Sequence, residues 1–158
     1  MKKSKFSFFL LCALVFMGIA LSSINCAGTG TMNGNLRVNI SDQPVWGPTG
    51  YDYVEYYYIP DIDVYYSVSE RQYIYREGLE WRYAVSLPAS YSSYDPYHSY
   101  KVAVYEAKPY QNNDSHREKY KMFKGKKDQQ VIRDSREDKY FAHKDHPDHD
   151  KWVKKQQH

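Results

Sequence analysis

With 158 residues, the chain has the length of one small domain, and its two cysteines exclude a fold held together by several disulfide bonds. The formal net charge is +3, and the lysines at positions 2, 3 and 5 account for all of it. The rest of the chain balances nineteen basic against nineteen acidic residues, so we expect no nucleic-acid partner.

The N-terminus has the pattern of a bacterial signal peptide. The lysines form a positive head, and residues 6–21 form an apolar run that is too short for a comfortable membrane span. Ser22, Ser23 and Asn25 then provide a small polar exit. We therefore predict that residues 1–26 are a signal peptide, and that Cys12 is removed with it so that the exported protein has no internal disulfide.

Cys26 stands at the end of the apolar run, where a lipoprotein carries its acylated cysteine. The residues before it, Ser23, Ile24 and Asn25, depart from the usual pattern of a leucine followed by small residues. Lipidation at Cys26 and simple secretion therefore both stay open. Residues 27–44 follow as a flexible linker, because their first part is rich in Gly and Thr.

Residues 45–110 are predicted to form the folded domain, because they contain sixteen of the eighteen tyrosines. Tyrosine and tryptophan favour strands and supply a large contact area with a polar end. Short alternating runs separated by turn residues predict a mainly β fold, a small antiparallel meander of four to five strands. The expected strands are 53–59, 62–66, 72–76, 79–87 and 100–105.

The strand at 79–87 shows the clearest alternation of apolar and polar residues. Its apolar positions share one face, and the opposite face is polar or small. We predict that this face is buried and that Trp81, at its centre, is the main aromatic residue of the core. The apolar positions are Leu79, Trp81, Tyr83, Val85 and Leu87.

Residues 111–158 are predicted to be a charged, largely irregular C-terminal tail. The apolar periodicity fades beyond Pro109, and lysines accumulate from Lys119 onward. A short helix at 115–123 is expected, with Ser115 as its N-cap and Glu118 three residues later. Since such a tail buries little apolar surface, we expect it to be separable from the β domain near Tyr110.

One long motif resembles a known family. The run PVWGPTGYDYVEYYYIPDIDVYY at residues 44–66 is similar to a family of uncharacterised exported proteins of Bacteroidetes. Trp81 and the segments 86–88, 108–110, 132–135 and 144–147 also resemble that family. The resemblance implies export and the same domain limits, but it carries no activity and no catalytic residues.

Three histidines recur at every third position in the tail, and carboxylates stand between them. His143, His146 and His149 could bind Zn, Ni or Cu. Pro147 disfavours a regular helix that would align the three rings, and no cysteine lies nearby. We therefore favour a solvated tail and expect no cofactor.

Catalysis has little support in the sequence. The domain lacks a nucleophile elbow and a glycine-rich phosphate loop. Asp61 and Asp63 lie two residues apart and could do acid/base work on a glycan, but carboxylates that keep a strand edge soluble explain them equally well. We expect that the protein is not an enzyme.

Two functions remain, and both use binding. The favoured one is a non-enzymatic structural or interaction module of the cell envelope, periplasmic or outer-membrane-associated, with an unknown envelope component as partner. Secretion stays open, and a membrane is contacted only through a lipid anchor. The alternative is an envelope glycan or peptidoglycan-binding module, in which the exposed tyrosines Tyr56, Tyr58, Tyr73 and Tyr75 stack on sugar rings.

Overall fold

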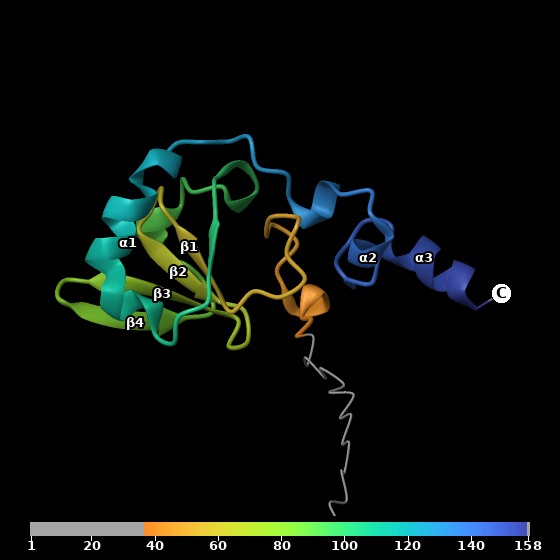
Figure 1. The fold of residues 1–158 in the computed structure, drawn as a ribbon, viewed down its shortest axis with the longest axis horizontal. Coiled ribbons are helices and arrows are strands. Elements are labelled where there is room, and N and C mark those ends of the chain that lie inside the picture. Colours follow the sequence, from red (N-terminus) through yellow and green to blue (C-terminus); the bar gives the residue numbers. More distant parts are fainter. Residues whose placement is uncertain (1–36, 158) are drawn as a thin grey trace, which may run out of the picture. The chain divides into compact units, whose positions relative to one another are not determined.

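Five short antiparallel strands form one sheet in the order β4-β3-β2-β1-β5 (Figure 1). The computed structural model describes residues 37–157; the predicted signal peptide 1–26, with Cys26, and the first part of the predicted linker lie outside the described residues. Strands β1 to β4 follow one another as a meander, and β5 returns to pair with β1. The predicted mainly β sheet is therefore confirmed. Its strands are β1 Tyr56–Ile59, β2 Val64–Ser67, β3 Gln72–Glu77, β4 Glu80–Ala84 and β5 Val102–Val104.

Tight turns fix the register of the meander. Glu77 pairs with Glu80, so only Gly78 and Leu79 connect β3 to β4. Gly78 has a φ of 63°, which a two-residue hairpin with glycine in its first central position requires. Asp63, just before β2, also has a positive φ, and its side chain accepts hydrogen bonds that hold this turn.

One face of the sheet packs on Trp46. This residue contacts the rings of Tyr57, Tyr66 and Tyr73, at centroid distances of 5.8, 4.9 and 6.2 Å. The neighbouring residue has to be glycine, because a Cβ on Gly47 would lie 2.9 Å from the Tyr57 hydroxyl. Trp46 is therefore the central aromatic residue of the first core cluster.

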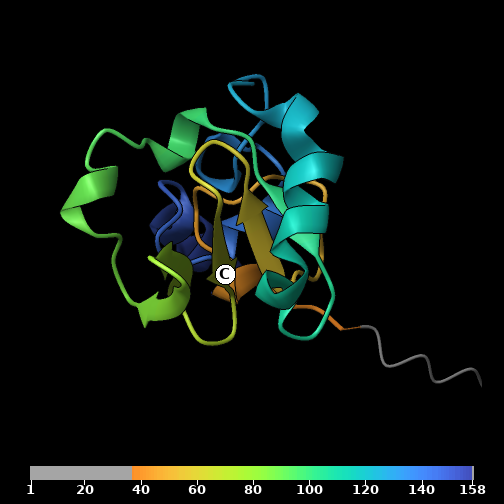
Figure 2. The same ribbon diagram turned by 90° about the vertical axis from the view of Figure 1, so that its left-hand side faces the viewer.

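The other face of the sheet is covered by helix α1, Asn113–Tyr120. Tyr58, Tyr65 and Ile74 are buried there, and Tyr120 of the helix packs against them. Figures 1 and 2 show α1 alongside the sheet. The predicted helix therefore exists, but it begins at Asn113, and Ser115 lies inside it instead of capping it.

The apolar face of β4 is not buried as predicted. Leu79, Tyr83 and Val85 are 89%, 53% and 76% exposed, and Trp81 is only half-buried. These residues stay exposed because β4 forms the edge of the sheet, whereas α1 packs over β1 and β2. Trp81 packs on Tyr65 and Tyr110 at the margin of the second core cluster.

The chain beyond Tyr110 packs on the domain instead of forming a separate tail. Ile132 donates its backbone N–H to the carbonyl of Gly47, and Val131 forms an isolated bridge with Pro48. Ile132 and Tyr140 are fully buried in a third core cluster. These contacts correct the expected boundary near Tyr110.

Two short helices complete the C-terminal segment: α2, Asp138–Phe141, and α3, His149–Gln156. The side chain of Tyr140, in α2, anchors this segment, because its hydroxyl accepts the backbone N–H of Gly50 at 2.6 Å. No helix among residues 37–157 is long and apolar enough to cross a membrane.

Candidate functional site

A polar hollow of about 450 Å³ lies between the β1–β2 turn and the loop that follows β4. The turn contributes Asp61, and the loop contributes two tyrosines, Tyr91 and Tyr94, together with Asp95. The remaining lining residues are Ile62, Ser90, Ser93, His98, Ser99 and Lys127. Aromatic residues, hydroxyls and carboxylates therefore line one concave surface.

Internal hydrogen bonds hold the loop in shape. Asp95 caps a short 3-10 helix, Pro96–His98, by accepting the N–H of Tyr97 at 2.8 Å, and its second oxygen lies 2.6 Å from Nδ1 of His98. The hydrogen bond from His98 lowers the pKa of Asp95 below its ordinary value. Asp95 is therefore an anion at neutral pH and stands at the rim of the hollow.

Tyr94 and Ser99 connect the two ends of the loop. Ser99 donates a hydrogen bond to the Tyr94 hydroxyl at 2.8 Å, and burial raises the pKa of Tyr94 well above its ordinary value. Tyr91 packs edge-on against Tyr75 of β3 at 6.2 Å. The loop is thereby attached to the sheet, while Tyr91 stays partly exposed and lines the hollow.

A buried lysine supports the loop from below. Lys101 has no exposed surface, and its Nζ donates to the carbonyl of Pro96 at 2.7 Å. Burial lowers the pKa of Lys101 to about 8, while the nearby carboxylates of Asp95 and Asp61 raise it. The side chain of Gln129 binds both backbone groups of Lys101, each at 2.9 Å.

The hollow suits a ligand that is rich in hydroxyl groups. Saccharides bind through aromatic faces that stack on their rings and through carboxylates and hydroxyls that hydrogen-bond their edges. The predicted acid pair does not form here, because Asp61 lines the hollow and accepts the N–H of Gly125. Asp63 instead accepts from Tyr58 and binds Arg117 of α1.

A second polar cluster lies under α1. His116 is buried, and its Nδ1 lies 2.9 Å from the Tyr65 hydroxyl while its Nε2 lies 3.2 Å from Glu106. Asn113 donates to Asp63 at 2.7 Å. This chain of contacts resembles a catalytic relay, but burial of Tyr65 closes it to a substrate, so it serves to dock the helix.

The four tyrosines predicted to stack on glycan do not form an exposed row. Tyr58 is 1% exposed, and Tyr73 is stacked on Trp46. Tyr56 is half-buried on the face that α1 covers. Tyr75 alone lies near the hollow, where it supports Tyr91. Their burial does not fit a row of exposed stacking residues, and the sequence pattern did not indicate the loop residues Tyr91 and Tyr94, because no alternation marks them.

The three tail histidines lie in consecutive tight turns. The Nδ1 atoms of His143 and His146 accept the backbone N–H groups of Asp145 and Asp148, and Nδ1 of His149 lies 2.8 Å from the carbonyl of Phe141. His143 and His146 are buried, which corrects the expectation of a solvated tail, and burial lowers the pKa of His143. Among residues 37–157, no three His, Cys, Asp or Glu side chains are grouped to hold a metal ion.

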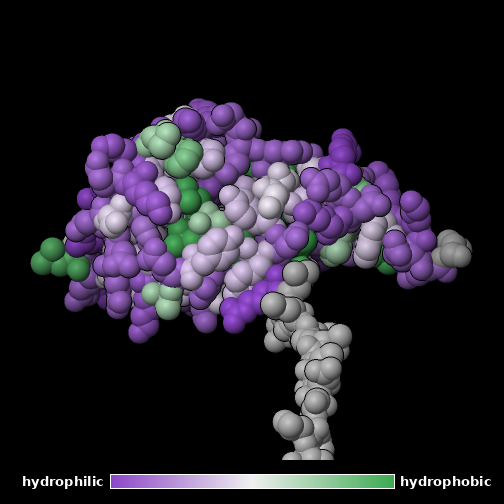
Figure 3. Space-filling view, in the orientation of Figure 1, coloured by the Kyte–Doolittle hydropathy of each residue, from purple (hydrophilic) through white to green (hydrophobic). Residues whose placement is uncertain are grey.

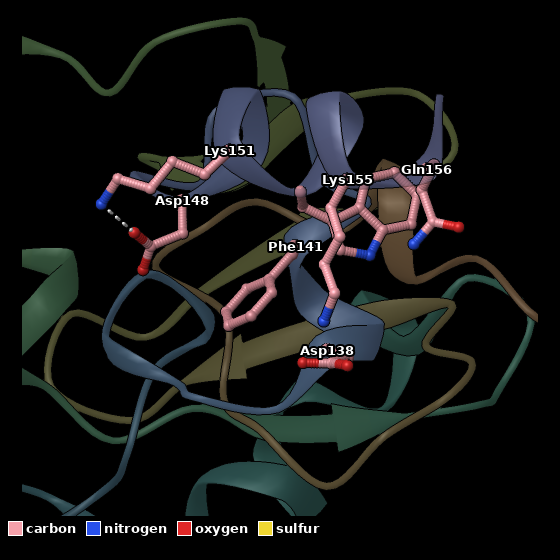
Figure 4. Close-up of a pocket in the computed structure, with 7 residues that line it drawn as sticks. Asp138, Phe141, Asp148, Lys151, Lys155 and Gln156 are labelled. Atoms are coloured by element: carbon pink, nitrogen blue, oxygen red, sulfur yellow. Dashed lines mark hydrogen bonds and ion pairs between the residues drawn. The ribbon is translucent and has the colours of Figure 1, made fainter. Parts of the chain in front are cut away.

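A smaller pocket of about 230 Å³ lies between α2 and α3 (Figure 4). Phe141 and Trp152 form its apolar part, and Asp138, Lys151 and Lys155 surround them. Asp148 binds Lys151 at 2.9 Å. This pocket is lined by no serine or tyrosine hydroxyl, whereas the loop hollow has both, so we regard the hollow as the better candidate site.

No family model, curated protein or solved structure matches the chain.

Proposed function

We propose that the protein is a non-enzymatic interaction module of the bacterial cell envelope, with the loop hollow as its ligand-binding surface. The observation that carries this proposal is the hollow itself, in which Tyr91, Asp61 and Asp95 converge over the buried Lys101. A loop attached to a sheet and supported from below is preorganised, which favours binding. The lysine-headed apolar run at residues 1–26 supports export, and Cys26 offers a lipid anchor.

A glycan of the envelope is the ligand class that the hollow favours. Its lining combines two tyrosine rings with two carboxylates and three serine hydroxyls. Peptidoglycan presents hydroxyls, amides and flat sugar faces, and these complement such a lining. Glycan binding is thus the second candidate function. In this version Tyr91 is the residue that stacks on a sugar ring, in place of the four strand tyrosines predicted from the sequence.

Co-sedimentation with purified peptidoglycan sacculi tests the glycan assignment. We expect the protein to sediment with sacculi, and Tyr91→Ala or Asp61→Asn to weaken the association roughly tenfold, because each removes one direct contact. Tyr105→Ala is the matched control, since Tyr105 is an exposed tyrosine outside the hollow. Thermal unfolding of each variant checks that the loop still folds.

Two results would separate the candidates. Equal sedimentation of all variants would exclude the hollow as a glycan site and leave the envelope module with another partner. If the protein remained in the cytoplasm with Met1 intact, the envelope proposal itself would be wrong.

A further inference from the structure

An alternating apolar row runs from Leu79 in the β3–β4 turn through Trp81 and Tyr83 of β4 to Val85, just beyond the strand, and it lies on the surface of this protein. Leu79, Tyr83 and Val85 are more than half exposed, and Trp81 is half-buried. Apolar areas also interrupt the hydrophilic surface in Figure 3. A row of this kind on a single strand is typical of an interaction site, because soluble monomers rarely leave contiguous apolar patches exposed.

The backbone of β4 is open at the same place. In an antiparallel pair, hydrogen-bonded and non-hydrogen-bonded positions alternate, and the pair that closes a two-residue hairpin is hydrogen-bonded. Glu77 and Glu80 close this hairpin, so the backbone groups of Trp81 and Tyr83 point away from β3. Neither residue makes a backbone hydrogen bond to another element of the described chain.

The opposite edge of the sheet is treated differently. Beside β5, the side chain of Gln129 both accepts from the backbone N–H of Lys101 and donates to its carbonyl. A side chain that binds both groups blocks the approach of another strand at that point. Gln129 therefore covers this edge at Lys101, whereas no side chain covers the backbone of β4 at Trp81 or Tyr83 among the described residues.

We propose that β4 pairs antiparallel with β4 of a second copy of this chain, across a two-fold axis at Trp81, so that two five-stranded sheets become one. Around this axis Glu80 lies opposite the partner's Arg82, Leu79 lies opposite the partner's Tyr83, and Trp81 lies opposite its own counterpart. The backbone groups of Trp81 and Tyr83 then gain hydrogen bonds, and the exposed apolar row is shared between the copies.

Charge complementarity selects this partner and this register. Arg82 contacts Glu77 at 3.1 Å and Glu80 at 2.8 Å within one chain, and all three side chains are more than half exposed, so they are free to be shared. A two-fold axis at Arg82 would instead place two arginines opposite each other, which is unfavourable. Residues 80–82, Glu-Trp-Arg, are thus self-complementary: in an antiparallel pair centred on Trp81, each glutamate faces the arginine of the other copy.

Sedimentation velocity of the protein purified as the whole chain, over a range of concentrations, tests this pairing. We expect a reversible dimer for the native sequence. Glu80→Arg should raise its dissociation constant roughly tenfold, because two like-charged pairs then face each other across the axis. The double variant Glu80→Arg with Arg82→Glu should restore the dimer, since each new arginine again faces a glutamate.

Glu70→Arg is the matched control, because Glu70 is exposed in the turn between β2 and β3 and lies outside β4. It should dimerise like the native protein, and the melting temperature of each variant shows whether it is folded. A protein that stays monomeric at about 100 µM would overturn the proposal. So would a dimer that tolerates Glu80→Arg, or a monomer in which the amides of Trp81 and Tyr83 are protected from exchange.

Discussion

Buried tyrosines in this core place their hydroxyls against hydrogen-bond partners. Tyr57 donates to Gln43 at 2.6 Å, Tyr58 donates to Asp63 at 2.9 Å, and Tyr65 meets His116 at the same distance. An unpartnered buried hydroxyl would cost about 1–3 kcal/mol. The abundance of tyrosine predicted a folded domain, but the partners could not be predicted, because Gln43 and His116 lie outside the tyrosine-rich strands.

At the residue scale, we predict that Trp46 contributes more to stability than Trp81. Trp46→Ala should lower the free energy of unfolding by about 3–5 kcal/mol, because it removes the ring that three tyrosines pack on. Trp81→Ala should cost about 1–2 kcal/mol, since that ring is only partly buried at the margin of the second core cluster. Urea unfolding of both variants measures the difference, and equal losses would contradict this assignment of the core.

At the scale of elements, the strands were largely predictable, since each lies in a short run of strand-forming residues that ends in turn residues. Alternation of apolar and polar residues does not reveal whether another element packs on the apolar face of a strand. The predicted strand at 79–87 has the most regular pattern in the chain, yet three of its apolar residues, Leu79, Tyr83 and Val85, are exposed. Apolar residues at every second position indicate a strand with one apolar face. Either the same chain or a partner can bury that face.

The sheet as an element should unfold in alkali. Burial raises the pKa of Tyr73 to about 12 and that of Tyr57 well above its ordinary value of 10. A phenol whose pKa is raised on folding stabilises the folded state below pH 10, and this stability is lost as the pH rises through the raised value. The sheet should therefore begin to unfold above about pH 10.

Circular dichroism and tyrosinate absorbance along one alkaline titration check this expectation. The buried phenols should ionise together with the loss of strand signal. If every tyrosine ionised near pH 10 while the strand signal stayed unchanged, the phenols would be accessible and the two core clusters would be incorrect.

At the scale of the whole molecule, the C-terminal segment is the part that sequence patterns described least well. It docks through single anchors, chiefly Ile132 and Tyr140, that are separated by charged residues. Single apolar anchors in irregular chain do not recur at the spacing of a helix or a strand. The sequence therefore showed no apolar periodicity, and its charged composition indicated a solvated tail. The hollow was missed for a similar reason, because Asp61 and Tyr91 are brought together by topology across 30 residues.

Limited digestion with trypsin tests how the C-terminal segment is attached. The exposed lysines at 124–127 lie in irregular chain between α1 and the docked segment, and we expect cleavage there first. The two fragments should remain associated, because Ile132 and Tyr140 are buried and residues 130–133 hydrogen-bond to residues 45–49. Size-exclusion chromatography of the nicked protein should therefore give one peak that contains both fragments.

Two variants of Tyr140 show whether its ring or its hydroxyl holds the segment. Tyr140→Ala should release the fragment from the nicked protein, because it leaves a cavity in the third core cluster. Tyr140→Phe keeps the ring and loses only the hydrogen bond from Gly50, so its fragments should mostly stay together. A digest that trims the native protein to a core ending near Tyr110 would show that the segment does not dock. In that case α1 could not cover Tyr58 and Tyr65, and that face of the sheet would need another cover.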